Sequence, residues 1–148
     1  MPANDVTLAT NYTTDYVESP CSLKTGWNLI TPTGAFDSES IELLMAFKPF
    51  GWDARRRIYV RADSAMIEAG APLWLFCRNA EELTLYVKPV ASWNPSFRRG
   101  WNLVGAPVDV PAGQLPAKVL PVWEWTRGRW APVTDGLKAG KGYWIFAE

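Results

Sequence analysis

One short motif occurs twice in this chain, each time ahead of a second repeated motif. Residues 26–30 read GWNLI and residues 100–104 read GWNLV, 74 positions later (100 − 26). AGAPLWLF at 69–76 then returns as AGKGYWIF at 139–146, 70 positions later (139 − 69). Two matches in one order indicate an internal repeat. We therefore expect two β repeats, residues 1–80 and 81–148, packed as one domain.

Both copies predict the same series of strands. The Thr-rich and β-branched segments 6–10 and 83–87 predict an opening strand. The GWNL segment follows, ended by Pro32 or Pro107, because proline cannot donate to a β-ladder. A hairpin and a final strand complete each copy. The hairpin of the second copy has strands 123–125 and 130–133; that of the first has a longer turn carrying 52–56, and the final strands are 73–77 and 143–146.

A short helix is expected between the GWNL strand and the hairpin. In the first copy, acidic and serine residues at 37–40 precede apolar residues at helical spacing up to Phe47, which predicts a capped helix of two to three turns. The counterpart at 112–120 contains Pro116 and allows at most one or two turns.

The predicted fold class is therefore all-β with one or two short helices. Halves of about 70 residues bury too little apolar surface to be stable alone, so we expect them to share a core as a pseudo-twofold β-sandwich or barrel. The linker 88–96, with Pro89 and Pro95, is short and semi-rigid. Two pairings remain open for the strand at 6–10: within its own half, or across to the second half.

The repeated motif resembles a known family. GWNL(I/V), a Trp-bearing hairpin and then GxGYWI together resemble a repeat found in large bacterial and archaeal secreted and cell-surface proteins. The resemblance covers residues 23–76 and 97–148. The second copy, with GKGYWI at 140–145, is the closer match; the first has Ala71, Pro72 and Leu73 in place of Lys, Gly and Tyr. The resemblance implies an all-β structural or interaction module, secreted or at the cell surface, without catalytic residues.

Charge and hydropathy narrow the range of possible binding partners. Fifteen basic and fifteen acidic side chains cancel, so no overall field attracts nucleic acid. No apolar run approaches the ~20 residues that span a bilayer, so membrane insertion is not expected. Residues 1–5 lack the features of a signal peptide, which is compatible with a cytoplasmic protein or with a piece of a longer one. We expect Cys21 and Cys77 to be free and mostly buried rather than bridged.

The sequence gives little support for catalytic activity. The chain has no histidine, which excludes Ser-His-Asp and Cys-His machinery and imidazole metal sites. Two sets of acidic residues could in principle act in a glycosidase. The first set is typical of a helix N-terminus and the second of turns. These groups are Asp37, Glu39 and Glu42, and Asp53, Asp63 and Glu68. Asp5, Asp15 and Glu18 lack calcium-loop spacing. We expect no enzyme activity, no cofactor and no metal.

The remaining candidates are aromatic and basic. Trp27, Trp74, Trp101 and Trp144 recur at matched positions and are therefore expected in the core. Arginines 55–57 and 61, near Trp52 and Tyr59, could bind a single nucleic-acid strand or an acidic glycan, but are expected to stack on tryptophan or to pair with Glu39 and Glu42. One of Trp123 and Trp125 is expected to face outward beside Arg127 and Arg129.

These observations favour a non-catalytic structural or protein-interaction module of a larger secreted or cell-surface protein. The alternative is a carbohydrate-binding module that uses exposed tryptophan and arginine side chains. Its expected partners are other protein domains or a glycan. The candidate ligand-binding residues are Trp52, Arg56, Tyr59, Trp125, Arg129 and Trp130.

Overall fold

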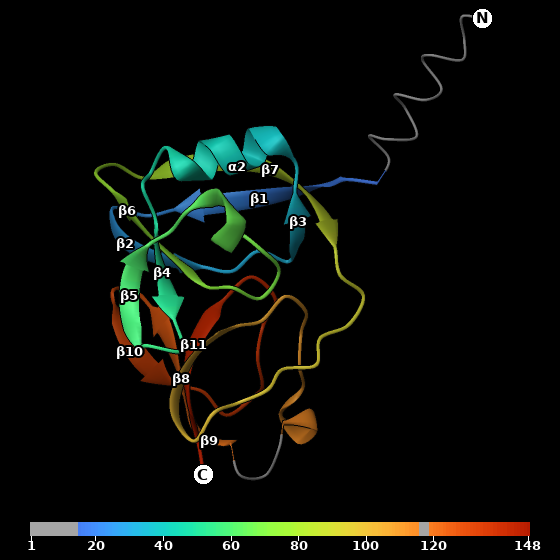
Figure 1. Ribbon diagram of the computed structural model, residues 1–148, viewed down its shortest axis with the longest axis vertical. Helices are drawn as coiled ribbons and strands as arrows, with labels where there is room; N and C mark the ends of the chain where they lie inside the picture. Colours follow the sequence, from blue (N-terminus) through green and yellow to red (C-terminus); the bar gives the residue numbers. More distant parts are fainter. Residues whose placement is uncertain (1–14, 116–118) are drawn as a thin grey trace, which may run out of the picture.

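The computed structural model describes residues 15–115 and 119–148 (Figure 1). Within these residues the strands form three antiparallel sheets and the one α-helix is short, which confirms the predicted class. From one end of the molecule to the other, the helix, the three-stranded sheet and the two four-stranded sheets follow in turn.

The two four-stranded sheets have corresponding strand orders. The first sheet has the order β2-β6-β4-β5, and the second has the order β8-β11-β9-β10. The strands of the first sheet are β2 (Gly26–Ile30), β6 (Leu73–Cys77), β4 (Phe50–Asp53) and β5 (Ile58–Arg61). Those of the second are β8 (Gly100–Gly105), β11 (Gly142–Ala147), β9 (Val119–Thr126) and β10 (Arg129–Pro132). A pseudo-twofold axis between the halves stays a prediction.

The strand register also corresponds. In the first sheet Trp27 lies opposite Phe76, and in the second Trp101 lies opposite Phe146. The GWNL segment is an edge strand in both sheets, next to the strand that closes each copy. The two repeated motifs of the sequence are therefore neighbours in space, hydrogen-bonded to each other.

The three-stranded sheet joins the beginning of one half to the beginning of the other. It has the order β1-β7-β3, with β1 (Val17–Leu23), β7 (Glu81–Pro89) and β3 (Gly34–Phe36). β1 pairs with β7 over its whole length, from Val17 opposite Val87 to Leu23 opposite Glu81. The strand expected at 6–10 lies outside the described residues. β1 is not among the strands that the sequence predicts: its residues alternate in exposure, but they are weakly apolar and include Pro20.

The predicted helix is confirmed as α2 (Ser38–Met45). The side chain of Asp37 accepts a hydrogen bond from Ser40 N at 2.9 Å and caps the first turn. Its counterpart in the second half is the short 3₁₀ helix η2 (Ala112–Gln114); residues 116–118 lie outside the described part. A further 3₁₀ turn, η1 (Ser64–Met66), precedes β6.

Two apolar cores lie on the inner faces of the sheets. The first is enclosed by the three-stranded sheet, α2 and the first four-stranded sheet. The second core covers one face of the second four-stranded sheet, with Trp93 of the linker and Phe97, just after it, packed against the core. The first contains Leu23, Phe36, Leu44, Leu73, Leu75, Cys77, Leu83, Leu85 and Val87; the second contains Ala106, Val122, Leu137, Tyr143 and Ile145.

The halves also meet through close backbone contacts. Thr31 N donates to Gly140 O at 3.0 Å, and Thr31 Oγ1 donates to Lys141 O at 2.9 Å. A Cβ atom on Gly105 would lie 2.4 Å from the side chain of Thr31, so only glycine allows this approach. The buried Thr31 thus connects the end of β2 to the turn that enters β11.

Both cysteines are free; Cys77 is buried and Cys21 is half-buried. Burial, and then the neighbouring Cys77, raise the pKa of the Cys21 thiol to about 11.

Among the described helices, none is long and apolar enough to cross a lipid bilayer.

Candidate functional site

The repeated asparagine explains why the GWN motif recurs. Asn28 Oδ1 accepts from Lys24 N at 2.9 Å, while its Nδ2 donates to Lys24 O at 2.9 Å and to Gly26 O at 3.2 Å. Asn102 makes the same contacts with Arg98 and Gly100. Both glycines have φ +99°, a conformation that favours glycine. The motif therefore builds one turn twice and fixes the tryptophan between glycine and asparagine.

Strand alternation sorts the residues of each sheet onto two faces. In β6, Leu73, Leu75 and Cys77 are buried in the first core, and Trp74 and Phe76 point to the other side. In β11, Tyr143 and Ile145 are buried, and Trp144 and Phe146 lie opposite. We call these outer sides together the aromatic face. It comprises Trp27, Phe50, Trp52, Tyr59, Trp74 and Phe76 of the first sheet, and Trp101, Trp123, Trp125, Trp130, Trp144 and Phe146 of the second.

The expectation that the recurring tryptophans lie in the core is wrong. Trp27 is 47% exposed and Trp101 is 43% exposed, and Trp74 and Trp144 are half-buried. They recur because both sheets repeat the same aromatic outer face, while mostly aliphatic residues, with Phe36 and Tyr143, fill the cores. The expectation that Trp123 and Trp125 face opposite ways is also wrong. Two residues apart on β9, they lie on the same side.

The aromatic sides of the two sheets contact each other. Trp52 and Trp144 have ring centroids 5.1 Å apart, and Trp74 and Trp125 are also 5.1 Å apart, both pairs edge-to-face. Such pairs are each worth about 0.5–1.5 kcal/mol beyond area burial. Trp125 Nε1 donates to the backbone Trp27 O at 3.2 Å across the same boundary. These contacts join the two sheets through their aromatic sides, while Trp27, Phe76 and Trp101 stay exposed.

Tyr59 lies among the same aromatic side chains. It is 44% exposed, and its ring packs against Trp52 with centroids 5.0 Å apart. Burial raises the pKa of its hydroxyl, while side-chain hydrogen bonding with Trp74 and Trp144, one from each sheet, acts in the opposite direction.

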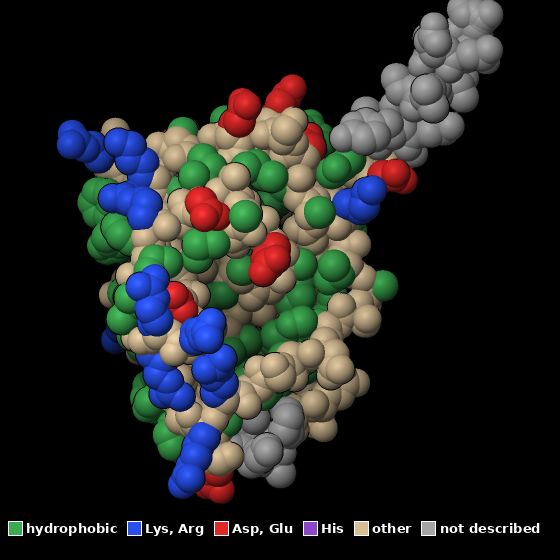
Figure 2. Space-filling model, viewed as in Figure 1, with side chains coloured by type: hydrophobic (Ala, Val, Ile, Leu, Met, Phe, Trp, Pro, Cys, Tyr) green, Lys and Arg blue, Asp and Glu red, His purple; other side chains and the backbone are tan. Residues whose placement is uncertain are grey.

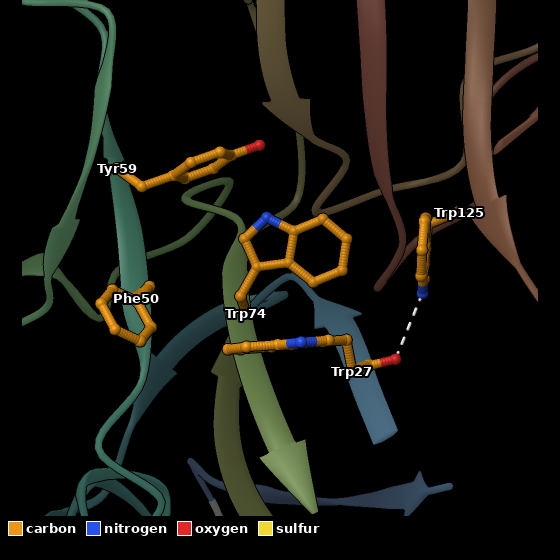
Figure 3. A pocket seen from close by; sticks show the side chains of 5 residues that line it. All are labelled: Trp27, Phe50, Tyr59, Trp74 and Trp125. Atoms are coloured by element: carbon orange, nitrogen blue, oxygen red, sulfur yellow. Dashed lines mark hydrogen bonds between the residues drawn. The ribbon is translucent and has the colours of Figure 1, made fainter. Parts of the chain in front are cut away.

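An open hollow of about 410 Å³ lies at one end of the aromatic face (Figure 3). The rings of Trp27 and Trp74 stand almost perpendicular, at 87°, and Trp125 closes the hollow from the second sheet. We call it the first hollow. All of its lining residues are aromatic: Trp27, Phe50, Tyr59, Trp74 and Trp125.

A second hollow of about 550 Å³ opens on the aromatic side of the second sheet. Its lining residues are Trp101, Trp123, Trp130 and Trp144. Trp101 and Trp144 stand at 90° to each other, as Trp27 and Trp74 do at 87° in the first hollow.

The hairpins carry most of the basic residues near this face. The β9–β10 turn consists of Arg127 and Gly128, both with positive φ, which is typical of a type I′ turn. The β4–β5 turn is longer and runs over residues 54–57. Trp52 belongs to β4 and not, as expected, to this turn. In Figure 2, Lys and Arg side chains gather on the side of the molecule over β5, β10 and β8.

The arginines of the first hairpin have partners other than those expected from the sequence. Arg56 Nε lies 2.8 Å from Asp53 Oδ2, and this hydrogen bond holds the pKa of Asp53 below its usual value. Arg57 Nη2 donates to Arg99 O at 2.7 Å, in the second half. Arg61 Nη1 donates to Lys48 O at 2.6 Å, and its guanidinium lies 4.3 Å from the Phe50 ring centroid. The expected partners Glu39 and Glu42 are instead on α2.

The structure brings only part of the predicted binding set together. Tyr59 and Trp125 line the first hollow, and Trp130 lines the second. Trp52 lies between the sheets in contact with Trp144, while Arg56 and Arg129 are exposed at hairpin ends. The sequence prediction missed Trp27, Phe50, Trp74, Trp101, Trp123 and Trp144. The alternation of Trp74 and Phe76 with Leu73 and Leu75 could have found the face, because it separates aromatic from aliphatic positions.

The acidic residues have local structural roles. Asp37 caps α2, and Asp63 accepts from Met66 N at 3.2 Å at the start of η1. Asp53 accepts from the backbone N–H groups of Arg55 and Arg56, each at 3.0 Å. Within residues 15–115 and 119–148, no group of three or more Asp, Glu, His or Cys side chains is arranged to hold a metal ion.

Comparison with known proteins gives no match: no family model, no curated protein and no solved structure is similar to this chain.

Proposed function

We propose that this chain is a non-catalytic interaction module of a larger secreted or cell-surface protein, and that the aromatic face is its binding surface. The observation that carries the proposal is the open aromatic face with its two hollows. Trp27, Phe76 and Trp101 are each more than 40% exposed, an arrangement rarely kept on a soluble surface without a contact to make. The location rests on the resemblance of the GWNL and GYWI motifs.

The residue types of the face suit protein contacts. Tryptophan, tyrosine and arginine are the residues that contribute most to binding energy in protein interfaces, and they do so where they surround a pocket. Here the pocket walls are held by edge-to-face contacts and by the hydrogen bond from Trp125 Nε1 to Trp27 O. A partner would therefore meet a preformed surface and would lose little free energy in ordering it.

Site-specific photo-crosslinking tests the proposal. A benzophenone side chain at position 27 should form adducts with one or a few proteins in extracts of the producing cells, and the same probe at the control position 86, on β7, should not. Trp74→Ala should reduce the adduct formed from position 27. Identical adducts from both positions, or none from position 27, would contradict the proposal. Cell fractionation tests the location, and recovery in the cytosol alone would overturn it.

Carbohydrate binding is the second candidate. It is favoured by the exposed rings of Trp27 and Trp101, because a flat indole is a stacking surface for a sugar ring. Titration of tryptophan fluorescence against a panel of polysaccharides tests it. A saturable shift that Trp130→Ala or Trp27→Ala abolishes would support this candidate, whereas an unchanged spectrum for every polysaccharide would remove it.

A further inference from the structure

The two hollows are built from corresponding positions of the two sheets. Phe50 lies opposite Trp74 in the first sheet, and Trp123 lies opposite Trp144 in the second. Likewise Tyr59 is opposite Trp52, and Trp130 is opposite Trp125. The edge tryptophan of the GWNL strand completes each hollow. A ligand type that fits one hollow therefore finds a similar arrangement of rings in the other.

The ring arrangement selects a compact apolar group. Perpendicular rings, such as Trp27 against Trp74, form a corner whose ring faces border the open, apolar hollow (Figure 3). An extended peptide with proline rings fits such a corner, and grooves lined by aromatic residues are a recurring binding site for polyproline II segments. A polyproline II segment is already extended before binding, so it loses little conformational entropy.

The exposed lining of the first hollow is almost wholly apolar. One of its few polar groups, Trp125 Nε1, is already used in the hydrogen bond to Trp27 O at 3.2 Å. A sugar needs several free donors and acceptors to orient its hydroxyl groups. Proline rings need only apolar contact, so the lining favours a proline-rich peptide over a glycan.

The charges around the two hollows constrain the charge of the ligand. Arg61 lies over the Phe50 ring of the first hollow, and the guanidinium of Arg57 approaches Gly100, next to Trp101 of the second. In the described strands of the two four-stranded sheets, the acidic residues are Asp53 and Glu124. Strand alternation places both on the side opposite the neighbouring tryptophans. An acidic ligand complements this surface, whereas a second copy would bring arginines against arginines.

We propose that each hollow docks one acidic, proline-rich segment in the polyproline II conformation, so that one chain holds two such segments. This inference rests on the proposed role of the aromatic face as a binding surface. Polyproline II has three residues per turn. A Pro-Pro-Glu repeat therefore keeps its carboxylates on one side, toward Arg61 or Arg57, while the prolines enter the hollow.

The test uses the dodecapeptide Ac-(Pro-Pro-Glu)₄-NH₂ as the probe. Isothermal titration should give two peptides per chain, and (Pro-Pro-Lys)₄ should bind at least about tenfold more weakly, a difference of about 1.4 kcal/mol. (Ala-Ala-Glu)₄ should bind no better than the lysine peptide. In ¹⁵N spectra the indole N–H signals of the hollow tryptophans should shift, and that of Trp93, in the second core, should not.

Matched substitutions separate the two hollows. Trp27→Ala should remove the first site and Trp101→Ala the second, each leaving one peptide per chain, and the double variant should bind none. Arg61→Gln should weaken binding about tenfold at the first hollow only. Tyr86→Ala, on β7, is the control and should keep both sites. The indole shifts of the unaltered protein give the same answer if a variant fails to fold.

Four outcomes would overturn the inference: equal binding of the glutamate and lysine peptides, a single site that both tryptophan variants leave unchanged, no indole shift with (Pro-Pro-Glu)₄, or shifts with polygalacturonate alone. If photo-crosslinks from position 27 to a protein persist in any of these cases, only the identity of the ligand is wrong. If the crosslinks are missing as well, the proposed function also fails.

Discussion

Asn28 and Asn102 each close the turn that begins a GWNL strand, and each does so with both ends of its amide. The half-buried side-chain amide of the asparagine supplies hydrogen-bond partners to backbone groups for which the turn has no backbone partner. Alanine can offer neither the donor nor the acceptor. The asparagine is therefore required by the turn and has no direct part in the hollows.

We predict that Asn28→Ala lowers the free energy of unfolding by about 2–3 kcal/mol, because two or three hydrogen bonds worth about 1 kcal/mol each are lost. Asn102→Ala should cost a similar amount. Denaturation in urea measures both changes. Asn79→Ala, on the exposed turn after β6, is the control and should stay within about 0.5 kcal/mol of the unaltered protein. Equal stability of all three variants would show that the turn does not depend on the amide.

A buried hydroxyl makes stability depend on alkaline pH. Tyr143 is fully buried, its hydroxyl accepts from Lys138 N at 2.7 Å, and burial raises its pKa from 10.0 to about 12. The folded state thus holds the proton more tightly than the unfolded chain. The resulting stability is complete below pH 10 and is lost as the pH rises through 12. Cys21, raised from 9.0 to about 11, acts in the same direction from pH 9 upward.

We therefore expect the melting temperature to be independent of these groups up to about pH 9 and to fall steeply toward pH 12. Tyr143→Phe should lower stability at neutral pH, because Lys138 N loses its acceptor, and should flatten the alkaline decline. Cys21→Ala should remove the part between pH 9 and 11. Tyr86→Phe, at an exposed position, should leave the profile unchanged; a Tyr143→Phe profile as steep as the original would contradict the assignment.

At the scale of elements, the predictions succeeded where one local pattern determines one element. Asp37 and Ser40 mark the start of α2, and the hairpin of β9 and β10 has its turn residues in place. β1 was missed because Pro20 and its small polar residues carry no strand signal; β1 exists because β7 lies beside it. The aromatic face was missed because recurrence alone cannot tell an inner face from an outer one. The alternation of Trp74 and Phe76 with Leu73 and Leu75 separates the two sides of β6, and packing against the other elements decides which side is buried.

The start of α2 also extends the pairing of β3. Beyond Phe36, Asp37 N donates to Tyr86 O at 3.1 Å, and Tyr86 N donates to the buried Ser40 Oγ at 2.8 Å. The hydrogen-bond ladder between β3 and β7 is therefore extended beyond Phe36 by the backbone N–H of Asp37 and the side chain of Ser40.

Ser40→Ala should destabilise the protein by about 1–3 kcal/mol, because the backbone N–H of Tyr86 is left without its acceptor in a partly buried place. The neighbouring Ser38, exposed on the same turn, offers the matched control Ser38→Ala. Hydrogen exchange at Tyr86 should accelerate in the first variant only. If both variants exchange and unfold alike, the contact is not the cause.

At the scale of the whole molecule, the halves depend on one another. β7 precedes the second GWNL strand, yet its partners β1 and β3 belong to the first half. Thr31 and Trp125 add hydrogen bonds across the boundary. The division expected at residue 80 therefore cuts through one three-stranded sheet and through hydrogen bonds between the two parts of the chain.

Residues 81–148 expressed alone should consequently lack a cooperative unfolding transition, since β7 would lose both neighbours and the aromatic side would lose Trp52 and Trp74. Urea titration followed by tryptophan fluorescence measures this. Adding residues 1–80 in trans should restore the transition. A monomeric, fully stable second half would show that the repeats fold independently.

The contacts among Trp74, Trp125 and Trp130 have a consequence for occupancy. Trp74 and Trp125 line the first hollow, Trp130 lines the second, and all three are within 6.1 Å of one another, centroid to centroid. The hollows thus share one wall, and a ring that moves for one ligand alters the space for the next. If both hollows bind as proposed, occupation of one would change the affinity of the other, and by linkage the factor would be the same whichever hollow fills first.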